Sequence, residues 1–547
     1  MMLELVEKRI RQFPTQLILV VIGAILFLPF LGKVHLFGLD EISFAESARE
    51  MLASRNFHVI QFDFIPYFGK PPLFIWLQAL SMHYFGVNEF AARLPNAIVG
   101  IATMLVVFNI GRYVFNSRLG VLWALFFACS ILPQVQFKSG IIDPAFNLFT
   151  FLGIFFMYKL NIINEFEDRK TRKKNRRRNL LFSALFIGLA TLTKGPVAIL
   201  ICLLTASAYI FANRGKMKIE LTELFFWGIL ISIIGIAWLL LDTSMNGFAF
   251  VMQFLRYQVR WFSTGEAGEG GPFFYHIPLL LIGVFPASAL IFSTFTRNVY
   301  DDLSEHIFRK WMIYFLIVVL ILCSLTPARI VHYSSVCYFS ITFLAAYYLN
   351  LLFDGKATWR WKQTVPLMGI GILIVGALTA AIFIIKSPEP FLPYIQDDFA
   401  KEALKTPVYW SDWDIRFGLI YLFCLVVSIL LMQSKNVRWG AYLLLISSGL
   451  FINTVMIFIV PRVEKYTQAA LIEFIQTKQN EACTIEPVGF KTYAHLFYAL
   501  KPAPEKQVSS KKNYFITKVN TVPEVLQTHP AAHELYRKNG WVFFVGE

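Results

Sequence analysis

The chain has 547 residues, of which 56% are hydrophobic and only 16% are charged, and its formal net charge is +15. Soluble proteins of average composition carry about 25% charged residues, so this composition excludes an ordinary soluble enzyme. A basic soluble protein would suggest a nucleic-acid partner. Here most of the positive charge lies in short segments between apolar runs, where it reports membrane topology, and we expect no nucleic-acid partner.

Apolar runs of about 17–22 residues, the length that crosses a ~30 Å hydrocarbon core, recur along the chain. They predict an all-α, polytopic membrane protein with about thirteen transmembrane helices. The runs cover approximately residues 15–32, 95–115, 119–137, 144–160, 180–193, 196–212, 224–241, 277–295, 312–325, 334–353, 364–385, 416–432 and 440–460. No small-residue cleavage site follows the first run, so we expect it to be a retained span and not a signal peptide.

Lysine and arginine residues gather in alternate segments between these runs, most densely in RKTRKKNRRR at residues 169–178. The other set of loops is longer in total yet holds about half as many basic residues, which favours a cytoplasmic N-terminus. The run at 169–178 has a nucleic-acid interpretation, but a topology anchor beside anionic membrane lipid explains it better. With an odd number of spans, residues 461–547 lie outside.

The first outer loop, residues 33–94, contains two segments with helical character. In residues 42–54 apolar side chains recur at helical spacing on one face, while Glu46, Arg49 and Glu50 fall elsewhere. The stretch PPLFIWLQALSMHYF is apolar and aromatic but too short to span a bilayer. Both segments are expected to be helices that lie in the plane of the membrane interface.

Acidic residues on the outer side are the first candidates for chemistry. Asp40 and Glu41 follow the first run directly, and Asp143 stands at the start of the fourth. A carboxylate at the membrane boundary is costly unless it is solvated, paired or used. The structural alternatives are a solvated loop start for the first two, and a helix cap for Asp143, because Pro144 suits the first helical turn.

Basic residues on the same side could meet a lipid phosphate. Lys70 precedes two prolines that fix the backbone and begin a helical stretch, and ordinary snorkelling is its alternative explanation. Lys194 falls at the predicted outer turn between the fifth and sixth runs, where a phosphate contact and a hairpin cap are equally open. Further cations on this side are Arg93, Arg256, Arg260 and Arg329.

The tail after the last run has a different, more polar character. It contains two strand-like pieces, NYFITKV and WVFFVGE, and one helix-like stretch, TVPEVLQTHPAAHELYRKNG. We therefore divide the chain into a transmembrane domain, residues 1–460, and a small outer α/β domain, residues 461–547. About 85 residues is near the lower limit for independent folding.

The order of the segments LDEISFAESAREML, FGKPPLFIWLQAL, FGVNEFAARLPNAIVG, IIDPAFNLF, LATLTKGPVA and PFFYHIPLLLIGVFP resembles that of the bacterial aminoarabinose transferases and protein mannosyltransferase-like glycosyltransferases of the GT-C fold. The match covers most of residues 36–345. The resemblance implies a helical membrane core with amphipathic helices in the first outer loop. It also implies that Asp40 matches the catalytic acidic residue, Lys70 the lysine that faces the carrier phosphate, and Asp143 a further acidic residue of the cavity.

One feature of the aminoarabinose subgroup is not reproduced. Those enzymes often carry a Glu before the lysine and a His before the later aromatic segment, as metal ligands. Here Gly69 precedes Lys70, and His276 follows the aromatic residues instead of preceding them. A divalent metal is therefore left open, with Glu269 and His276 as weak candidate ligands.

The resemblance implies transfer of a sugar from a polyprenyl-phosphate carrier to an envelope acceptor at the periplasmic face of the inner membrane. A lipid A-like glycolipid is the favoured acceptor, and protein or another glycan is the alternative. Asp40, with Glu41 and Asp143, would assist the attacking group, while Lys70 with Arg256 or Arg260 would neutralise the departing phosphate. The rival class is a transporter or flippase, which would place ionisable groups near the bilayer midplane.

Overall fold

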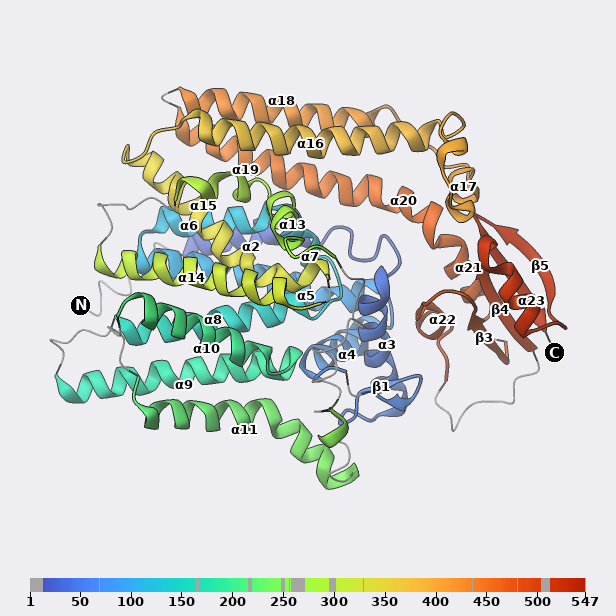
Figure 1. The fold of residues 1–547 in the computed structure, drawn as a ribbon, viewed down its shortest axis with the longest axis horizontal. Helices are drawn as coiled ribbons and strands as arrows, with labels where there is room; N and C mark the ends of the chain where they lie inside the picture. The colour runs from blue at the N-terminus through green and yellow to red at the C-terminus, as the bar shows by residue number, and fades with distance from the viewer. Residues whose placement is uncertain are drawn as a thin grey trace.

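The structure is a computed structural model that describes residues 13–67, 69–162, 168–214, 219–246, 251–254, 256, 271–294, 302–327, 329–434, 436–479, 481–502 and 512–546. Long helices run side by side along the horizontal direction of Figure 1, and a small sheet with short helices covers one end of them. The helices of the bundle are α2 (Phe13–Phe27), α5 (Glu89–Val114), α6 (Ser117–Ala128), α7 (Ile131–Gln136), α8 (Asp143–Asn161), α9 (Arg169–Lys194), α10 (Val197–Ala212), α11 (Leu221–Asn246), α13 (His276–Gly283), α14 (Leu303–Leu325), α15 (Tyr338–Phe353), α16 (Trp361–Lys386), α18 (Trp413–Gln433), α19 (Val437–Thr454) and α20 (Val460–Thr467).

Every predicted apolar run falls on one or two of these helices. In the described part of the chain, six helical segments are long and apolar enough to cross a membrane, judged by length and composition. The prediction of a predominantly helical protein with several candidate spans is therefore confirmed. The number of thirteen crossings stays a prediction.

Three of the predicted runs are interrupted in the structure. The run 119–137 divides into α6 and α7, and the run 277–295 divides into α13 and the 3₁₀ helix η2 (Ala287–Ser293). The run 440–460 passes from α19 through a short π-helix, η5 (Val455–Ile459), into α20. Pro286 and Pro461 lie at the second and third interruptions, and a proline has no N–H with which to continue a helical ladder.

Two of the predicted runs are shorter than the length needed to cross a membrane, and both prove to be the ends of longer helices. The run 180–193 belongs to α9, which begins at Arg169, and the run 312–325 belongs to α14, which begins at Leu303. The side chain of Asp168 accepts a hydrogen bond from the N–H of Thr171 and so caps α9. Helix capping lets both helices continue through polar residues beyond their apolar runs.

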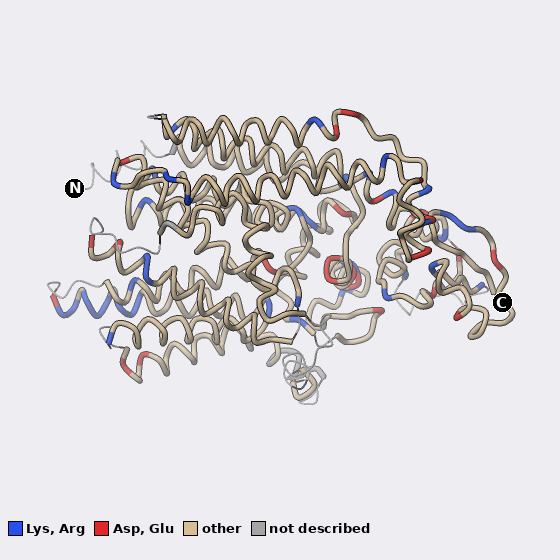
Figure 2. Tube along the Cα trace, turned by 45° about the horizontal axis from the view of Figure 1, so that its top comes forward, with Lys and Arg blue, Asp and Glu red and all other residues tan. Residues whose placement is uncertain are grey.

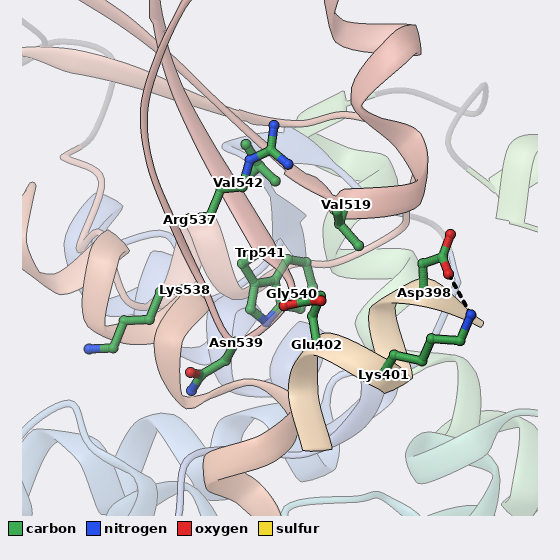
Figure 3. Close-up of a pocket in the computed structure, with 10 residues that line it drawn as sticks. All are labelled: Asp398, Lys401, Glu402, Val519, Arg537, Lys538, Asn539, Gly540, Trp541 and Val542. Atoms are coloured by element: carbon green, nitrogen blue, oxygen red, sulfur yellow. Dashed lines mark hydrogen bonds and ion pairs between the residues drawn. The ribbon is translucent and has the colours of Figure 1, made fainter. Parts of the chain in front are cut away.

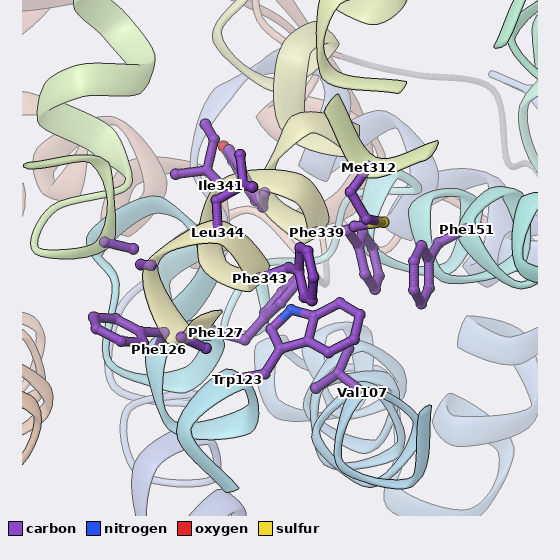
Figure 4. Packing of buried hydrophobic residues seen from close by; sticks show 14 of the residues in the cluster. Val107, Trp123, Phe126, Phe127, Phe151, Met312, Phe339, Ile341, Phe343 and Leu344 are labelled. Atoms are coloured by element: carbon purple, nitrogen blue, oxygen red, sulfur yellow. The ribbon is translucent and has the colours of Figure 1, made fainter. Parts of the chain in front are cut away.

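The middle of the bundle is closely packed with aromatic residues from α6, α8 and α15 (Figure 4). The rings of Phe151 and Phe339 are stacked with centroids 4.2 Å apart. Trp123 is fully buried and its indole N–H donates to the hydroxyl of Thr342 at 3.1 Å. Such aromatic contacts add to the burial of apolar area, so these helices form a rigid frame for the end of the bundle.

The first outer loop forms α3 (Gly38–Ser54), a hairpin of β1 (Gln61–Phe62) and β2 (Ile65–Pro66), and α4 (Leu73–Phe85). Both predicted helices are confirmed, and α3 runs across the end of the bundle in Figure 1. The polar face of α3 is not exposed, however, because Glu46, Arg49 and Glu50 are all buried. The cover comes from the C-terminal residues, since Arg49 donates to the carbonyl oxygen of Lys501 at 2.8 Å.

The C-terminal residues form a four-stranded sheet in the order β3–β4–β6–β5, with β3 and β4 parallel and the other pairs antiparallel. Its strands are β3 (Cys483–Pro487), β4 (Lys512–Lys518), β5 (His533–Lys538) and β6 (Trp541–Gly546). The short helices near it are α17 (Asp398–Leu404), α21 (Ala469–Thr477), α22 (Ala494–Phe497) and α23 (Val522–Thr528). The division of the chain at residue 460 stays a prediction, and the helical run 437–467 passes through that point.

The prediction of one helix over TVPEVLQTHPAAHELYRKNG is wrong in its second half. Only α23 is helical, and HELYRK forms the edge strand β5. Pro530 cannot donate a helical hydrogen bond, so the helix ends before it. Asn539 and Gly540 both have positive φ, 54° and 80°, as a tight hairpin between β5 and β6 requires. The Asn-Gly pair was the local signal for this strand.

The distribution of charge along the bundle bears on its orientation. The basic first half of α9 lies at the end of the bundle opposite to the C-terminal sheet (Figure 2). A membrane that surrounded the bundle would therefore separate the basic segment at 169–178 from α3, α4 and the sheet. The positive-inside rule predicts that the sheet lies on the outer side, and this orientation stays a prediction.

We expect a reporter enzyme that is active only in the periplasm to be active when fused after Glu547. The same reporter inserted at Asn175, inside the basic segment, is expected to be silent, because that segment is held in the cytoplasm by its charge. Reporter activity in cells, normalised to protein level, measures both fusions. The opposite pair of results would place every candidate residue in the wrong compartment and contradict the proposed reaction.

Candidate active site

Four side chains from distant parts of the sequence meet at the end of the bundle where α3 lies. They are Asp40 in the first turn of α3, Asp143 at the start of α8, Lys194 at the end of α9, and His332 in the 3₁₀ helix η3 (Val331–Cys337). The Nζ of Lys194 lies 2.5 Å from Oδ1 of Asp143. The Nε2 of His332 lies 3.3 Å from Oδ2 of Asp40 and 3.8 Å from Oδ2 of Asp143. His332 thus connects two of the predicted acidic residues, and Lys194 pairs with one of them.

The two carboxylates differ in access to solvent. The side chain of Asp40 is 41% exposed, whereas that of Asp143 is 2% exposed. A reactant entering this end of the bundle can reach Asp40 but not Asp143. Asp40 is therefore the candidate for direct chemistry, and Asp143 is the residue that holds Lys194 in place.

The charges of the cluster act on one another and on Lys70. Burial and the positive charge of Lys194 lower the pKa of Lys70 to about 8, although the charges of Asp40 and Asp143 oppose this. Burial alone would raise the pKa of Asp40, but the hydrogen bond and charge of His332 and the charges of the two lysines hold it below its ordinary value. At neutral pH Asp40 is therefore ionised and Lys70 is mostly a cation.

Hydrogen bonds from α5 and a proline at the start of α8 explain the position of Asp143. The side-chain amide of Asn96 donates to the carbonyl oxygens of Ser139 and Ile141, at 2.7 and 2.6 Å, and so holds the loop that leads into α8. Pro144 occupies the first turn of that helix. The alternative that Asp143 caps α8 is wrong, because the helix begins without a side-chain cap and the carboxylate binds Lys194 instead.

The sequence left two interpretations of Lys194 open, a contact with a phosphate and a cap of the hairpin between two helices. Its surroundings in the structure exclude the cap. Gly195 makes the turn after α9, with φ of 100° and an N–H that bonds to the carbonyl oxygen of Thr191. The lysine side chain turns instead toward Asp143, and its Nζ lies 4.9 Å from the ring centre of Tyr333. Lys194 therefore belongs to the charged cluster and not to the hairpin cap.

Glu41 is separated from the cluster even though it follows Asp40 in sequence. Its carboxylate is buried and binds the guanidinium of Arg93 at 2.8 and 3.1 Å. It also accepts hydrogen bonds from the N–H groups of Phe37 and Gly140, at 2.5 and 2.6 Å. These four contacts make Glu41 a tether between α3 and the loop before α8, so the predicted acidic pair does not act as one unit.

Replacing Arg93 with Met is expected to destabilise the protein by about 3–5 kcal/mol, because the buried charge of Glu41 would lose its partner. Arg93 also donates to the carbonyl oxygens of Leu31, Val34 and His35, which would be left without it. The measurement is the midpoint of thermal unfolding of the detergent-purified protein, followed by fluorescence.

The matched control for this experiment is Arg118→Met. Arg118 pairs with Asp354, and both side chains are about one-third exposed, at 32% and 29%. A partly exposed pair of this kind contributes about 1 kcal/mol or less. Equal, small changes in the unfolding midpoint of both variants would contradict the structural role assigned to Arg93 and Glu41.

Two of the three arginines predicted to meet the carrier phosphate lie among the described residues. Arg329 donates to the carbonyl oxygens of Cys323, Ser324 and Gly271, at 3.4, 3.2 and 3.3 Å, and so covers the end of α14. Arg256 is exposed. Arg260 lies outside the described residues. Among the predicted cations, the described structure therefore brings only Lys70 and Lys194 to the acidic cluster.

Of the two weak candidate metal ligands, only His276 lies among the described residues. His276 is buried and its Nδ1 lies 3.1 Å from the hydroxyl of Ser334. Glu269 lies outside the described residues. Among the residues that the structure describes, no group of three or more His, Cys, Asp and Glu side chains is arranged to hold a metal ion. In the acidic cluster, Lys194 binds a carboxylate oxygen of Asp143 and His332 binds one of Asp40.

His332 is the residue of the cluster that the sequence did not predict. It stands in the outer segment between the runs 312–325 and 334–353, next to Tyr333. A titratable side chain between two spans on the outer side was the only local signal. Its importance comes from the bundle, because η3 reaches the carboxylates of α3 and α8 only after the helices pack.

A cavity of about 440 Å³ lies elsewhere, between α17 and the C-terminal sheet (Figure 3). Its charged lining residues already have partners. Asp398 pairs with Lys401 within the cavity wall, and Arg537 and Lys538 pair with glutamates outside it. Nothing in this cavity matches the convergence of charge around Asp40, so we do not place the reaction there.

The geometry of the cluster suits the chemistry of an anionic substrate. Lys70 and Lys194 bring positive charge to the cluster, and Asp40 is an ionised, partly exposed carboxylate beside them. His332 holds Asp40 by a charge-assisted contact, which keeps the carboxylate oriented. Fixed charges in a site with little water act more strongly than the same charges in solution.

Comparison with known proteins supports the resemblance seen in the sequence. Residues 69–240 match the family described as dolichyl-phosphate-mannose-protein mannosyltransferase, a range that includes Lys70, Asp143 and Lys194. An undecaprenyl phosphate-alpha-4-amino-4-deoxy-L-arabinose arabinosyl transferase of Shewanella sediminis is 26% identical over 269 residues, 48% of this chain and 46% of that protein. An uncharacterized protein of Aquifex aeolicus is 26% identical over 393 residues, 71% of this chain and 83% of that protein.

Solved structures share the fold over nearly the whole chain. ArnT from Cupriavidus metallidurans bound to undecaprenyl phosphate aligns with a TM-score of 0.76 at 17% identity, over 97% of both chains. The oligosaccharyltransferase AglB from Archaeoglobus fulgidus aligns with a TM-score of 0.53 at 10% identity, over 98% of this chain and 74% of that one. In sequence, the chain spans about half the length of the curated transferases it matches. These findings confirm the predicted resemblance to aminoarabinose transferase-like glycosyltransferases of the GT-C fold.

Proposed function

We propose that this chain is a glycosyltransferase of the inner membrane that moves a sugar from a polyprenyl-phosphate carrier to an envelope acceptor on the periplasmic face. The observation that carries the proposal is the meeting of Asp40, Asp143, Lys70, Lys194 and His332 at one end of a GT-C-type helix bundle. Support comes from a solved structure of the same fold that holds undecaprenyl phosphate.

The proposed reaction is a displacement at the C1 carbon of the sugar. An oxygen of the acceptor forms a bond to C1, the bond between C1 and the carrier phosphate oxygen breaks, and the polyprenyl phosphate leaves with the electron pair. Lys70 and Lys194 neutralise the negative charge that grows on the phosphate. Asp40 takes the proton if the acceptor is a hydroxyl, or stabilises the positive charge that develops on the sugar.

We propose that the displacement is independent of a divalent metal or depends on it only weakly. Enzymes that use nucleotide sugars commonly clamp a diphosphate with a metal ion, whereas the leaving group here carries one phosphate. Two lysines beside it supply positive charge of the same order. Activity is therefore expected to survive treatment with EDTA in large part.

A lipid A-like glycolipid is our proposed acceptor. The carrier that we propose for this chain is of the kind named in the arabinosyl transferases among the relatives, undecaprenyl phosphate. Transfer to protein is the second candidate, favoured by the match to the protein mannosyltransferase family and by the fold shared with AglB, solved with an inhibitory peptide. A transporter is not favoured, because Asp143 and Lys194 lie at the first residue of α8 and the last residue of α9, and not midway along these helices.

The deciding experiment is mass spectrometry of envelope lipids from a deletion strain and from the same strain carrying the gene. Loss of one sugar from a glycolipid in the deletion strain, restored by the gene, would report the sugar and the acceptor together. The purified protein is then tested for transfer from a polyprenyl-phosphate sugar, with and without EDTA. Substrate movement across proteoliposomes without transfer would support a transporter instead.

A further inference from the structure

The four residues before α3 have no regular secondary structure, so their backbone groups depend on side chains for hydrogen bonds. The carbonyl oxygens of Leu31, Val34 and His35 accept from Arg93. The N–H of Phe37 donates to Glu41 at 2.5 Å. These contacts come from the membrane region and hold one side of the segment that leads to Asp40.

The other side of this segment is held by residues from the C-terminal part of the chain. The N–H of His35 donates to the carboxylate of Glu464 at 2.9 Å. The N–H of Leu36 donates to the hydroxyl of Tyr498 at 2.7 Å, in a buried contact. The carbonyl oxygen of Leu36 accepts from the side chain of Gln468 at 3.1 Å. Three successive backbone groups just before α3 are therefore hydrogen-bonded to side chains from the C-terminal part of the chain. Glu464 belongs to α20, Gln468 follows that helix directly, and Tyr498 follows α22.

A second contact ties the same C-terminal residues to the later turns of α3. The guanidinium of Arg49 donates to the carbonyl oxygen of Lys501, and Lys501 Nζ lies 2.6 Å from Asp63. Glu46 binds Arg49 at 2.7 Å. Burial and the charge of Glu46 raise the pKa of Glu50 above its ordinary value. The C-terminal residues thus contact α3 through hydrogen bonds and ion pairs as well as through apolar side chains.

From these contacts we infer that the C-terminal unit, residues 461–546, is a positioning element for transfer, and that Tyr498 and Glu464 act through the backbone of His35 and Leu36 to set the place of Asp40. The inference rests on the proposed function and assigns the C-terminal unit a role within it. Asp40 lies four residues after Leu36, in the first turn of α3, so a shift of the segment before that helix moves the carboxylate directly. A displacement of about 1 Å in a catalytic group can cost on the order of 10²-fold in rate.

The test uses the full chain with Tyr498→Phe, which removes one hydroxyl and keeps the ring. We expect kcat for transfer to fall about tenfold while KM for the polyprenyl-phosphate sugar stays the same, because the lysines that meet the phosphate are untouched. Hydrogen–deuterium exchange of the backbone at residues 35–41 is expected to become faster. A role limited to general stability would lower apparent kcat only in proportion to the loss of folded protein, so kcat is normalised to the folded fraction. It would also speed exchange throughout the C-terminal unit and not mainly at residues 35–41.

A matched control is Tyr514→Phe. Its hydroxyl donates to Glu481 at 2.7 Å in the same unit, away from α3, so kcat and exchange at residues 35–41 should remain those of the wild type. Glu464 provides a second, graded test. Glu464→Gln retains an oxygen that can accept from His35, so it should keep more activity than Glu464→Ala.

Failure of the proposed function and failure of the positioning role would give different results. A wild-type chain that transfers no sugar would overturn the proposed function. A wild-type chain that transfers, together with a Tyr498→Phe variant of normal kcat, would overturn only the positioning role. If Tyr498→Phe does not fold, the comparison of Glu464→Gln with Glu464→Ala decides, and equal kcat in those two variants would overturn the inference.

Discussion

Replacing Asp40 with Asn is expected to lower the turnover of sugar transfer by about 10²-fold or more. The change keeps the shape of the side chain and removes its charge and basicity. Asp40 is the accessible carboxylate of the cluster, and His332 holds it at 3.3 Å. Because Asp143 is buried and already binds Lys194, it has no route to the acceptor and should not replace the missing base.

The measurement is kcat of the purified variant, with carrier binding measured separately. Binding of the polyprenyl-phosphate carrier should change little, since Lys70 and Lys194 remain. Asp412→Asn is a suitable control, because Asp412 is exposed and pairs with Lys386 far from the cluster. Normal turnover in folded Asp40→Asn protein would contradict the assignment of Asp40 as the catalytic carboxylate.

Glu41→Gln is the second comparison for Asp40, since the two carboxylates are adjacent in sequence. The buried pair with Arg93 predicts that Glu41→Gln acts mainly through stability. A lower unfolding midpoint with near-normal kcat in the surviving protein would separate the two residues. A loss of kcat at unchanged stability in Glu41→Gln would instead return Glu41 to the reaction.

Replacing Lys70 with Ala is expected to weaken carrier binding by about 1.5–3 kcal/mol, since a phosphate would lose a charge-assisted partner. This corresponds to about 10- to 150-fold in Kd. Lys70→Arg should restore part of the loss, although its planar guanidinium fits the site differently. The measurement is the affinity of the purified protein for the polyprenyl-phosphate sugar, with Lys33→Ala as an exposed outer-loop control.

The same residue predicts a pH dependence with a defined sign. The pKa of Lys70 is lowered to about 8, so its positive charge is present below that pH and is lost as pH rises through it. Carrier affinity of the wild type should therefore decline above pH 8. Arginine stays charged over this range, so Lys70→Arg should show no such decline. Unchanged affinity in Lys70→Ala would favour snorkelling as the role of Lys70.

Much of the architecture follows from local pattern. Each long apolar run became a helix, because a run of this kind satisfies its backbone only by internal hydrogen bonds in a membrane. Lys70 and Asp143 lie beside prolines that begin α4 and α8, and their place at the helix starts could be deduced from sequence. Breaks inside runs were harder to foresee, since they depend on single residues such as Pro286 and Pro461.

The roles of neighbouring residues were decided by tertiary structure. Asp40 and Glu41 look equivalent in sequence, yet successive residues of a helix point about 100° apart, so one faces the cluster and the other faces Arg93. His332 meets Asp40 and Asp143, and Lys194 meets Asp143, only because α3, α8, α9 and η3 pack together.

The sequence by itself determined the multi-span helical character, most helix positions and the resemblance to GT-C-type transferases, and its charge pattern predicts the orientation. Tertiary structure alone decided which of the charged residues meet. It also decided that the C-terminal residues hold the start of α3. The physical reason is that periodicity and charge are local properties, whereas burial and ion pairing depend on partners supplied by distant segments.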